Sequence, residues 1–250
     1  MIKKVVVSAA GQGTRMLELT KDKSKHLINV ENRPFLAYLL DNILEAGYSE
    51  IILVAGFRED MIREFLKQYN AKGAKISIIN QFKILGPKEK EYGTACPIKC
   101  VKDLVGGENF ISLVGDNFYT VEQLKAMNVD DNYCYVAGVK SETPEKFGVL
   151  VENGELLEKI VEKPKEFVGS LINTSLYKFT PRIFEKVFQI GKSPRGEYEI
   201  TDAISLLAQE KEVKMKKFND FWMDFGRPQD IEKFSNFIKN GNPKTISKSA

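Results

Sequence analysis

Histidine, cysteine and long apolar runs are scarce in this sequence, and each shortage excludes a class of protein. One histidine and three cysteines, with no C-x-x-C pair among them, leave too few ligands for a zinc centre or a redox motif. No apolar run approaches the ~20 residues that cross a bilayer, and the first residues lead into a strand pattern rather than a signal peptide. We therefore expect a cytoplasmic protein with structural thiols and no membrane partner.

An excess of charge of one sign is also lacking. The 37 lysines and arginines are nearly balanced by 34 aspartates and glutamates, which leaves a net charge of +3. Such a balance argues against nucleic acid as a partner, so any phosphate recognition is expected to be local. A hydrophobic content of 43% supports a packed core, and 250 residues fit one large α/β domain.

The most informative segment is residues 5–16, where an apolar strand pattern leads into a loop with two glycines. Gly11 and Gly13 lack the Cβ atoms that would keep a phosphate away from the backbone N–H groups. Arg15 adds a planar cation that can hold two phosphate oxygens. The segment lacks the third glycine of a dinucleotide fingerprint, where Met16 stands, and the lysine of a P-loop. It predicts a phosphate-binding loop, although by itself an ordinary strand-to-loop turn explains it equally well.

The first part of the chain alternates predicted strands and helices, which is typical of a parallel sheet with helices on both faces. Ligands of such a sheet bind at the carboxyl ends of the strands, where the Gly11 loop and Asp116 are expected to lie. The expected strands are 5–8, 51–55, 76–79 and 110–114, and the expected helices are 36–44, 60–69 and 97–104.

From Tyr133 onward the pattern changes to short strands, which predict a smaller mixed β lobe that forms one wall of a cleft. Asn153 and Gly154 stand between two alternating runs and predict a hairpin. The expected strands are 135–139, 148–151, 157–162, 171–179 and 213–218, with helices near 181–189 and 200–209 and an amphipathic helix around Phe234. Residues 241–250 are expected to form a polar tail.

Together, the motifs of the chain resemble those of the sugar-1-phosphate nucleotidylyltransferases, in the same order and over about nine tenths of the sequence. The matching pieces are residues 9–16 with Ser24-Lys25, and then 93–95, 114–117, 147–149, 162–164, Asn173 with Tyr177, 199–202 and 222–226. The resemblance implies a Rossmann-like, mostly parallel sheet flanked by helices, with the mixed β lobe holding the sugar. It implies one domain over residues 1–240, with a nucleotide lobe at about 1–132, a sugar lobe at about 133–220 and a closing segment at 221–240.

The reaction implied by the resemblance is the transfer of a nucleoside monophosphate from UTP or dTTP to a sugar 1-phosphate, most simply glucose 1-phosphate, with release of pyrophosphate. A sugar phosphate with a second pKa near ~6 is mostly dianionic at pH 7 and needs no general base. The two polyanions need charge screening and alignment instead, and Mg²⁺ is the implied cofactor. The partners are thus a nucleoside triphosphate and a sugar 1-phosphate, and a homo-oligomer is left open.

Residue roles also follow from the resemblance. Arg15, Lys25 and Lys163 would act in catalysis, and Asp116 with Asp224 would hold the metal. Without the family, Asp116 is equally explained as a turn or helix cap and Lys25 as a solvated surface lysine. The nucleotide-binding positions are Ala10, Gly11, Gly13, Thr14, Gln81, Gly93, Thr94 and Asp116, and the sugar-binding positions are Gly148, Glu162, Lys163, Asn173 and Glu199.

Two departures from the family pattern affect the substrate pockets. The usual N-A-G-[IV]-Y is replaced by a run with Thr174, Ser175 and Leu176, so side chains occupy positions that the pattern keeps small. The loop 82–92, between Gln81 and Gly93, is longer and more charged than is usual. Gln81 can therefore read the base only if this loop bulges outward.

Two other function classes compete with the enzyme. A noncatalytic subunit of the same fold would bind nucleotide or sugar phosphate as a signal, because fold does not determine function. Retention of Arg15, Lys25, Asp116 and Asp224 together favours the active enzyme. A nicotinamide-dependent oxidoreductase is excluded by the missing third glycine.

Overall fold

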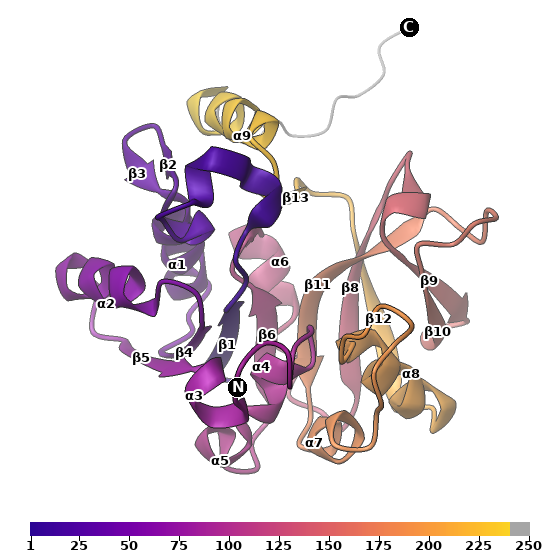
Figure 1. The fold of residues 1–250 in the computed structure, drawn as a ribbon. Coiled ribbons are helices and arrows are strands. Elements are labelled where there is room, and N and C mark those ends of the chain that lie inside the picture. The colour runs from indigo at the N-terminus through magenta and orange to yellow at the C-terminus, as the bar shows by residue number, and fades with distance from the viewer. Residues whose placement is uncertain (241–250) are drawn as a thin grey trace, which may run out of the picture.

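The computed structural model describes residues 1–240, so the expected polar tail at 241–250 lies outside the described residues. One sheet of nine strands runs through the whole molecule in the order β5-β4-β1-β6-β11-β8-β12-β10-β9 (Figure 1). Helices cover both faces of the half that contains β1. No helix among these residues is long and apolar enough to cross a membrane.

The first half of the sheet is parallel. Its strands are rich in valine and isoleucine, as expected for strands buried on both faces. The strands are β1 (Lys4–Ala9), β4 (Glu50–Ala55), β5 (Lys75–Asn80) and β6 (Phe110–Val114), and they match the predicted ones within one residue at each end.

The second half of the sheet is mixed. Strand β11 is antiparallel to both β6 and β8, and it joins this half to the first. Asn153 pairs with Leu156 across Gly154, which confirms the predicted hairpin. The strands are β8 (Cys134–Lys140), β9 (Gly148–Asn153), β10 (Leu156–Glu162), β11 (Leu171–Phe179) and β12 (Val213–Phe218). The predicted sugar lobe is therefore the mixed half of the same sheet.

The two faces of the sheet bury two separate cores, and the alternation of side chains along β1 separates them. Val5 and Val7 pack with α1 (Phe35–Glu45), α2 (Glu59–Gln68) and α6 (Val121–Ala126). Val6 packs on the other face with α4 (Cys96–Lys99), α7 (Arg182–Val187) and α8 (Ile200–Gln209).

The predicted helix 97–104 is wrong in its continuity. The structure has two single-turn helices instead, α4 and α5 (Lys102–Val105), separated at Cys100 and Val101. Ile98, Val101 and Val105 are all buried, so two short turns suffice to bring these side chains into the core.

The last described helix, α9 (Gln229–Asn240), returns to the N-terminal half of the molecule (Figure 1). Phe234 on α9 is fully buried and contacts the rings of Phe35, Phe118 and Phe225. The short elements near it are η1 (Thr14–Thr20), η2 (Lys25–Leu27), β2 (Asn29–Val30), β3 (Arg33–Pro34), β7 (Asn117–Phe118) and β13 (Met223–Asp224). This packing fixes the predicted closing segment against η1 and β7.

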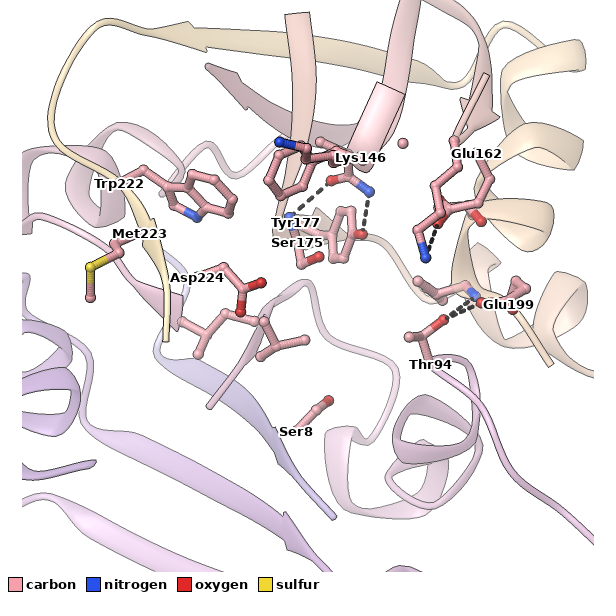
Figure 2. A pocket seen from close by; sticks show the side chains of 18 of the residues that line it. Ser8, Thr94, Lys146, Glu162, Ser175, Tyr177, Glu199, Trp222, Met223 and Asp224 are labelled. Atoms are coloured by element: carbon pink, nitrogen blue, oxygen red, sulfur yellow. Dashed lines mark hydrogen bonds and ion pairs between the residues drawn. The ribbon is translucent and has the colours of Figure 1, made fainter. Parts of the chain in front are cut away.

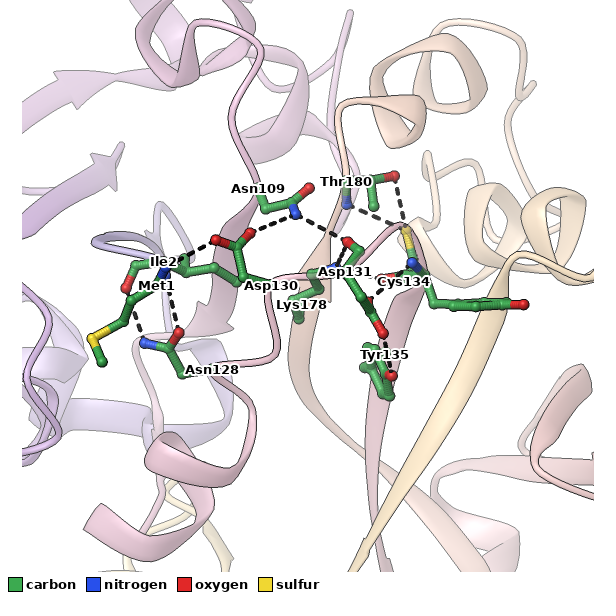
Figure 3. A network of polar contacts seen from close by, with 11 residues as sticks. Met1, Ile2, Asn109, Asn128, Asp130, Asp131, Cys134, Tyr135, Lys178 and Thr180 are labelled. Carbon is green, nitrogen blue, oxygen red and sulfur yellow. Dashed lines mark hydrogen bonds and ion pairs between the residues drawn. The ribbon is translucent and has the colours of Figure 1, made fainter.

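The segment between the two halves is held by hydrogen bonds at the sheet edge opposite to the Gly11 loop (Figure 3). Lys178 on β11 is fully buried, and its Nζ donates to the backbone oxygens of Asp131 and Tyr133, both at 2.6 Å. Asp130 binds the N-terminal ammonium of Met1 at 2.9 Å. The predicted boundary near residue 132 therefore falls in a segment that is anchored to both halves of the sheet.

Candidate active site

The site begins where the parallel strands β1 and β6 end. The two strands are neighbours, so the residues that follow them meet at one edge of the sheet. Gly115 N–H donates to the Ser8 carbonyl oxygen at 2.8 Å and fixes the start of one loop against the other. The phosphate-binding loop and Asp116 therefore face the same space, as predicted.

The glycine loop makes room for a lysine. Gly13 has φ of +69°, which is easy only for glycine, and a Cβ atom there would lie 2.9 Å from the Cβ of Lys25. Gly11 lies beside the end of the same side chain. The two glycines thus allow Lys25 to lie across the loop, a purpose that the sequence alone did not indicate.

Four charged side chains meet beside this loop. Strand β7 pairs with β13, so that Asn117 stands opposite Asp224, and Phe225 N–H donates to the Asp116 carbonyl oxygen at 2.7 Å. Lys25 forms an ion pair with Asp116, and Arg15 Nη1 lies 3.8 Å from Asp224 Oδ2. The pairing of β7 with β13 brings together residues that are more than a hundred positions apart.

The two carboxyl groups differ in their electrostatics. Burial acts to raise the pKa of Asp116, but the charge and hydrogen bond of Lys25, with smaller contributions from His26 and the backbone, together outweigh burial and hold that pKa below its usual value. Burial and then the charge of Asp116 raise the pKa of Asp224 to about 6. Two acids this close are stable together only with cations around them, which here are Lys25 and Arg15.

A cavity of about 270 Å³ opens beside the glycine loop and is lined by six of the predicted nucleotide-binding residues together with Lys25. Gln81 is buried there, and within the described part of the chain no hydrogen-bond donor reaches its Oε1 atom. It begins helix α3 (Gln81–Leu85), so the long loop does not displace it. The six residues are Ala10, Gly11, Gln81, Gly93, Thr94 and Asp116.

Gly93 closes this cavity in a way that only glycine allows. It has φ of +132°, and a Cβ atom on it would lie 2.3 Å from the Tyr198 carbonyl oxygen. The Tyr198 N–H donates to the Tyr92 carbonyl oxygen at 2.8 Å, and the Tyr198 carbonyl oxygen accepts from Ala95 N–H at 2.9 Å. The neighbouring Glu197, which follows the predicted sugar strands, lines the smaller cavity.

A larger cavity of about 410 Å³ adjoins the first one and shares Arg15 and Thr94 with it (Figure 2). It contains every predicted sugar-binding residue, and Asp224 faces it from β13. The predicted residues in it are Gly148, Glu162, Lys163, Asn173 and Glu199. The structure thus places the predicted nucleotide-binding and sugar-binding residues in two adjoining cavities that share Arg15.

The polar groups of the larger cavity are held in place by the protein. Asn173 donates from Nδ2 to the Tyr177 hydroxyl at 2.8 Å and accepts at Oδ1 from Ser175 N–H at 2.9 Å. Glu199 is buried, and its two oxygens accept from Thr94 Oγ1 at 3.2 Å and from Arg195 Nη2 at 2.7 Å. These groups therefore have defined positions before any ligand binds.

The comparison with known proteins identifies the family, because residues 4–241 match the nucleotidyl transferase family. The chain belongs to this family. It is 31% identical over 234 residues to the UTP–glucose-1-phosphate uridylyltransferase AglF of Haloferax volcanii. This alignment covers 90% of this chain and 92% of that protein. It is also 32% identical over 237 residues to the glucose-1-phosphate thymidylyltransferase of Streptomyces griseus. That alignment covers 91% of this chain and 64% of that protein.

The fold is shared with solved structures of the same kind. The crystal structure of UDP-glucose pyrophosphorylase complexed with UDP-glucose matches with a TM-score of 0.82 at 24% identity, over 96% of this chain and 99% of that one. These matches confirm the predicted α/β nucleotidyltransferase fold, the resemblance on which it rested, and the assignment of the chain as an enzyme.

Two predicted residues line neither cavity of this nucleotidyltransferase. Gly13 serves as the bend before η1 and contacts Lys25, and Thr14 is exposed at the first position of η1. The chain turns into a 3-10 helix here, which points these residues away from the cavities. Direct binding of nucleotide by Gly13 or Thr14 therefore has no support in this structure.

Four cations of the larger cavity were missed from the sequence, namely Lys146, Arg195, Arg227 and Lys233, and Arg195 is the one that contacts predicted sugar-binding residues. Arg195 lies on the loop before α8, and its Nη2 atom is 2.7 Å from Glu199 and 3.7 Å from Glu162. A single arginine in a charged loop carries no recognisable motif. It could have been suspected only from its spacing of four residues before Glu199.

The charged cluster of the enzyme fits a magnesium ion that substrates help to hold. Within residues 1–240 no three His, Cys, Asp or Glu side chains gather as a metal site of their own. Asp116 and Asp224 are close enough for one charge to shift the pKa of the other. Because Mg²⁺ is commonly held by one or two carboxylates plus substrate phosphates, this pair suits it.

Proposed function

We propose that this enzyme transfers a uridylyl group from UTP to glucose 1-phosphate, giving UDP-glucose and pyrophosphate, with dTTP as a weaker donor. The observation that carries the proposal is that two cavities meet at one cluster of charges. Arg15 lines both cavities, and Lys25 with Asp116 lines the smaller one. A site of this shape can bring two phosphorylated ligands together in line.

The chemistry consists of one substitution at phosphorus. An oxygen of the sugar phosphate attacks the α-phosphorus of the triphosphate, and pyrophosphate leaves with the electron pair of the broken bond. Arg15 and Lys25 hold the triphosphate, since both are cations beside the glycine loop. Their charge stabilises the negative charge that grows on the phosphoryl oxygens.

Lys163 and Arg195 provide charge on the acceptor side of the cluster. Both line the larger cavity, where Lys163 Nζ lies 3.8 Å from Glu162 Oε1. We assign them to the phosphate of the sugar, which they hold in position for attack. Asn173, Glu162 and Glu199 then bind hydroxyl groups of the ring, because amide and carboxylate groups suit hydroxyls.

Asp116 and Asp224 would hold one Mg²⁺ together with the substrate phosphates. When bound, this ion supplies screening of the negative charges that meet in the site. The carboxylates are now paired with Lys25 and Arg15, and we propose that these cations turn to the phosphates when the substrates enter.

Gln81 is the proposed reader of the base. Its buried Oε1 atom has no partner within the described residues, and a buried acceptor of this kind is costly unless a ligand satisfies it. An amide can donate and accept at once, which matches the polar edge of uracil or thymine. Gly93 lets the base approach the backbone on the other side of the cavity.

The assay that tests the proposal measures pyrophosphate release with each nucleoside triphosphate and a panel of sugar 1-phosphates. Turnover is expected to be fastest with UTP and glucose 1-phosphate, and to stop when EDTA removes Mg²⁺. A purine triphosphate as the best donor would contradict the base assignment and the role of Gln81. Binding of both ligands without any pyrophosphate would support the noncatalytic alternative instead.

A further inference from the structure

Ser175 has a backbone conformation that is unfavourable for serine. Its φ is +58°, in the left-handed region that is strained for a residue with a Cβ atom. The family pattern has a glycine at this position, which would adopt the same conformation without that cost. The chain therefore keeps a side chain here at the expense of stability.

A bulge in β11 imposes this conformation. Asn173 pairs with Gly138 and Tyr177 with Val136, so three residues of β11 stand opposite one residue of β8. The Thr174 carbonyl oxygen accepts from Asn117 Nδ2 at 3.1 Å and from the Tyr119 hydroxyl at 2.9 Å. These buried hydrogen bonds hold the bulge from the side of β7, so Ser175 cannot relax without breaking them.

The Ser175 side chain lies in the larger cavity, beside Tyr177 on the wall formed by β11 (Figure 2). Burial raises the pKa of the Tyr177 hydroxyl to about 12, and Asn173 and Ser175 act against that rise as hydrogen-bond partners. Asn173 Nδ2 donates to this hydroxyl at 2.8 Å. A hydroxyl group rotates about its C–O bond, so the Ser175 hydroxyl can direct its hydrogen into the cavity that it lines.

We propose that Ser175 determines which sugars the acceptor pocket prefers, because its hydroxyl forms a hydrogen bond with one hydroxyl group of the hexose that glycine at this position cannot form. This inference rests on the proposed binding of glucose 1-phosphate in the larger cavity. It explains why strain is kept here, since strained residues persist where the surrounding structure holds them and function uses them. Lys163, in the same cavity, also has a left-handed backbone, with φ of +45°.

The first test measures the strain by thermal unfolding. Ser175→Gly is expected to melt about 2–4 °C above Ser175→Ala, because alanine keeps the Cβ atom and glycine removes it. Lys211, with φ of +61° after α8 and outside both cavities, provides the matched control. The melting temperature of Lys211→Gly should exceed that of Lys211→Ala by a similar amount. Equal melting of the two Ser175 variants would overturn the premise.

The second test measures binding and needs no turnover. Glucose 1-phosphate and its 2-, 3-, 4- and 6-deoxy analogues are titrated into wild type, Ser175→Ala and Ser175→Gly, with and without a non-reacting UTP analogue. Both variants are expected to bind glucose 1-phosphate roughly 3–10-fold more weakly, the range for one neutral hydrogen bond. The loss should disappear for the single analogue that lacks the contacted hydroxyl.

The outcomes separate this inference from the proposed function. A loss that is the same for every analogue, or no loss at all, overturns the role of Ser175 even if pyrophosphate is released at a normal rate. A loss that is absent for one analogue and present for glucose 1-phosphate and the other analogues supports the role even if the nucleotide assignment fails. Failure of wild type to bind any of these sugar phosphates overturns both proposals.

Discussion

The two halves of the sheet contribute polar groups to the same site, but these groups differ in whether their hydrogen bonds are already satisfied by the protein. On the parallel side, Gln81 has a buried acceptor without a hydrogen-bond partner among residues 1–240, and Lys25 neutralises Asp116. On the mixed side, the amide of Asn173 and the carboxylate of Glu199 are already hydrogen-bonded. Under the proposed function, the polar groups of the nucleotide side exchange partners when the triphosphate binds, whereas those of the sugar side are organised in advance.

The halves also differ in how they form sharp bends near the site. On the parallel side the residues with positive φ are glycines, Gly13 and Gly93. On the mixed side they are Lys163 and Ser175, which have side chains in the larger cavity. Under the proposed function, the mixed half therefore stores strain where the sugar would bind, and the parallel half avoids it where the nucleotide would bind.

The largest effect is expected from the two acids at the junction of the halves. Asp116→Asn and Asp224→Asn should each lower kcat by roughly 10³-fold, because charge screening by the metal is worth several kcal/mol. Steady-state pyrophosphate assays measure this, with Asp220→Asn as the control, since Asp220 lines neither cavity of the site. Near-normal rates in both variants would contradict the proposed metal binding by Asp116 and Asp224 and the proposed reaction centre between the two halves.

The next effect concerns the cations of the nucleotide side. Arg15→Ala and Lys25→Ala should each cost roughly 10²–10³-fold, mostly in kcat, because their charge stabilises the transition state more than the bound substrate. Lys21→Ala is the control, since Lys21 is exposed and pairs only with Glu18 among the described residues. A change confined to KM would show that these cations act only in binding.

A pH effect on stability is expected from His26 in the parallel half. Burial, with the charge of Lys25, lowers the pKa of His26 to about 3, so the folded protein keeps this ring neutral while the unfolded chain takes up a proton below pH 6.5. The contribution of His26 to the free energy of unfolding should therefore fall as the pH falls from 7 to 4.5, while the raised pKa of Asp224 acts in the opposite direction. His26→Asn should reduce that fall by roughly 2–3 kcal/mol.

Urea unfolding at the two pH values measures the difference between wild type and His26→Asn. Because His26 is the only histidine, the proton resonances of its ring report its titration directly. A ring that titrates near pH 6.5 in the folded protein would contradict the expected neutral, buried state.

The smallest effect is expected on the sugar side, which several groups share. Lys163→Ala should weaken the use of glucose 1-phosphate by roughly tenfold, about 1.4 kcal/mol, and leave UTP binding nearly unchanged. Lys165→Ala is the control, since Lys165 lies two residues away and outside both cavities. Weakened UTP binding with a normal KM for the sugar phosphate would place Lys163 on the nucleotide side.

Local patterns in the sequence predicted most of the fold. The apolar run at the start of β1, the three-four spacing of α1 and the Asn-Gly turn between β9 and β10 each depend on neighbours in the chain. The helix 97–104 was predicted wrongly in its continuity because buried residues at helical spacing do not show whether the backbone between them bends. Of the site, the loop, Asp116 and the sugar residues were predicted, whereas Arg195 was missed because it has no local pattern.

The sequence by itself determined which segments become strands and helices, because burial of alternating or helically spaced side chains is a local property. Only the tertiary structure decided that Asp224 stands beside Asp116, since a short pairing of β7 with β13 joins parts of the chain that share no local signal. It also decided that the Gly13 bend makes room for Lys25 and that Ser175 keeps a left-handed backbone. These three features depend on which groups are buried together. The groups come from residues that are distant in sequence, so no local pattern predicts them.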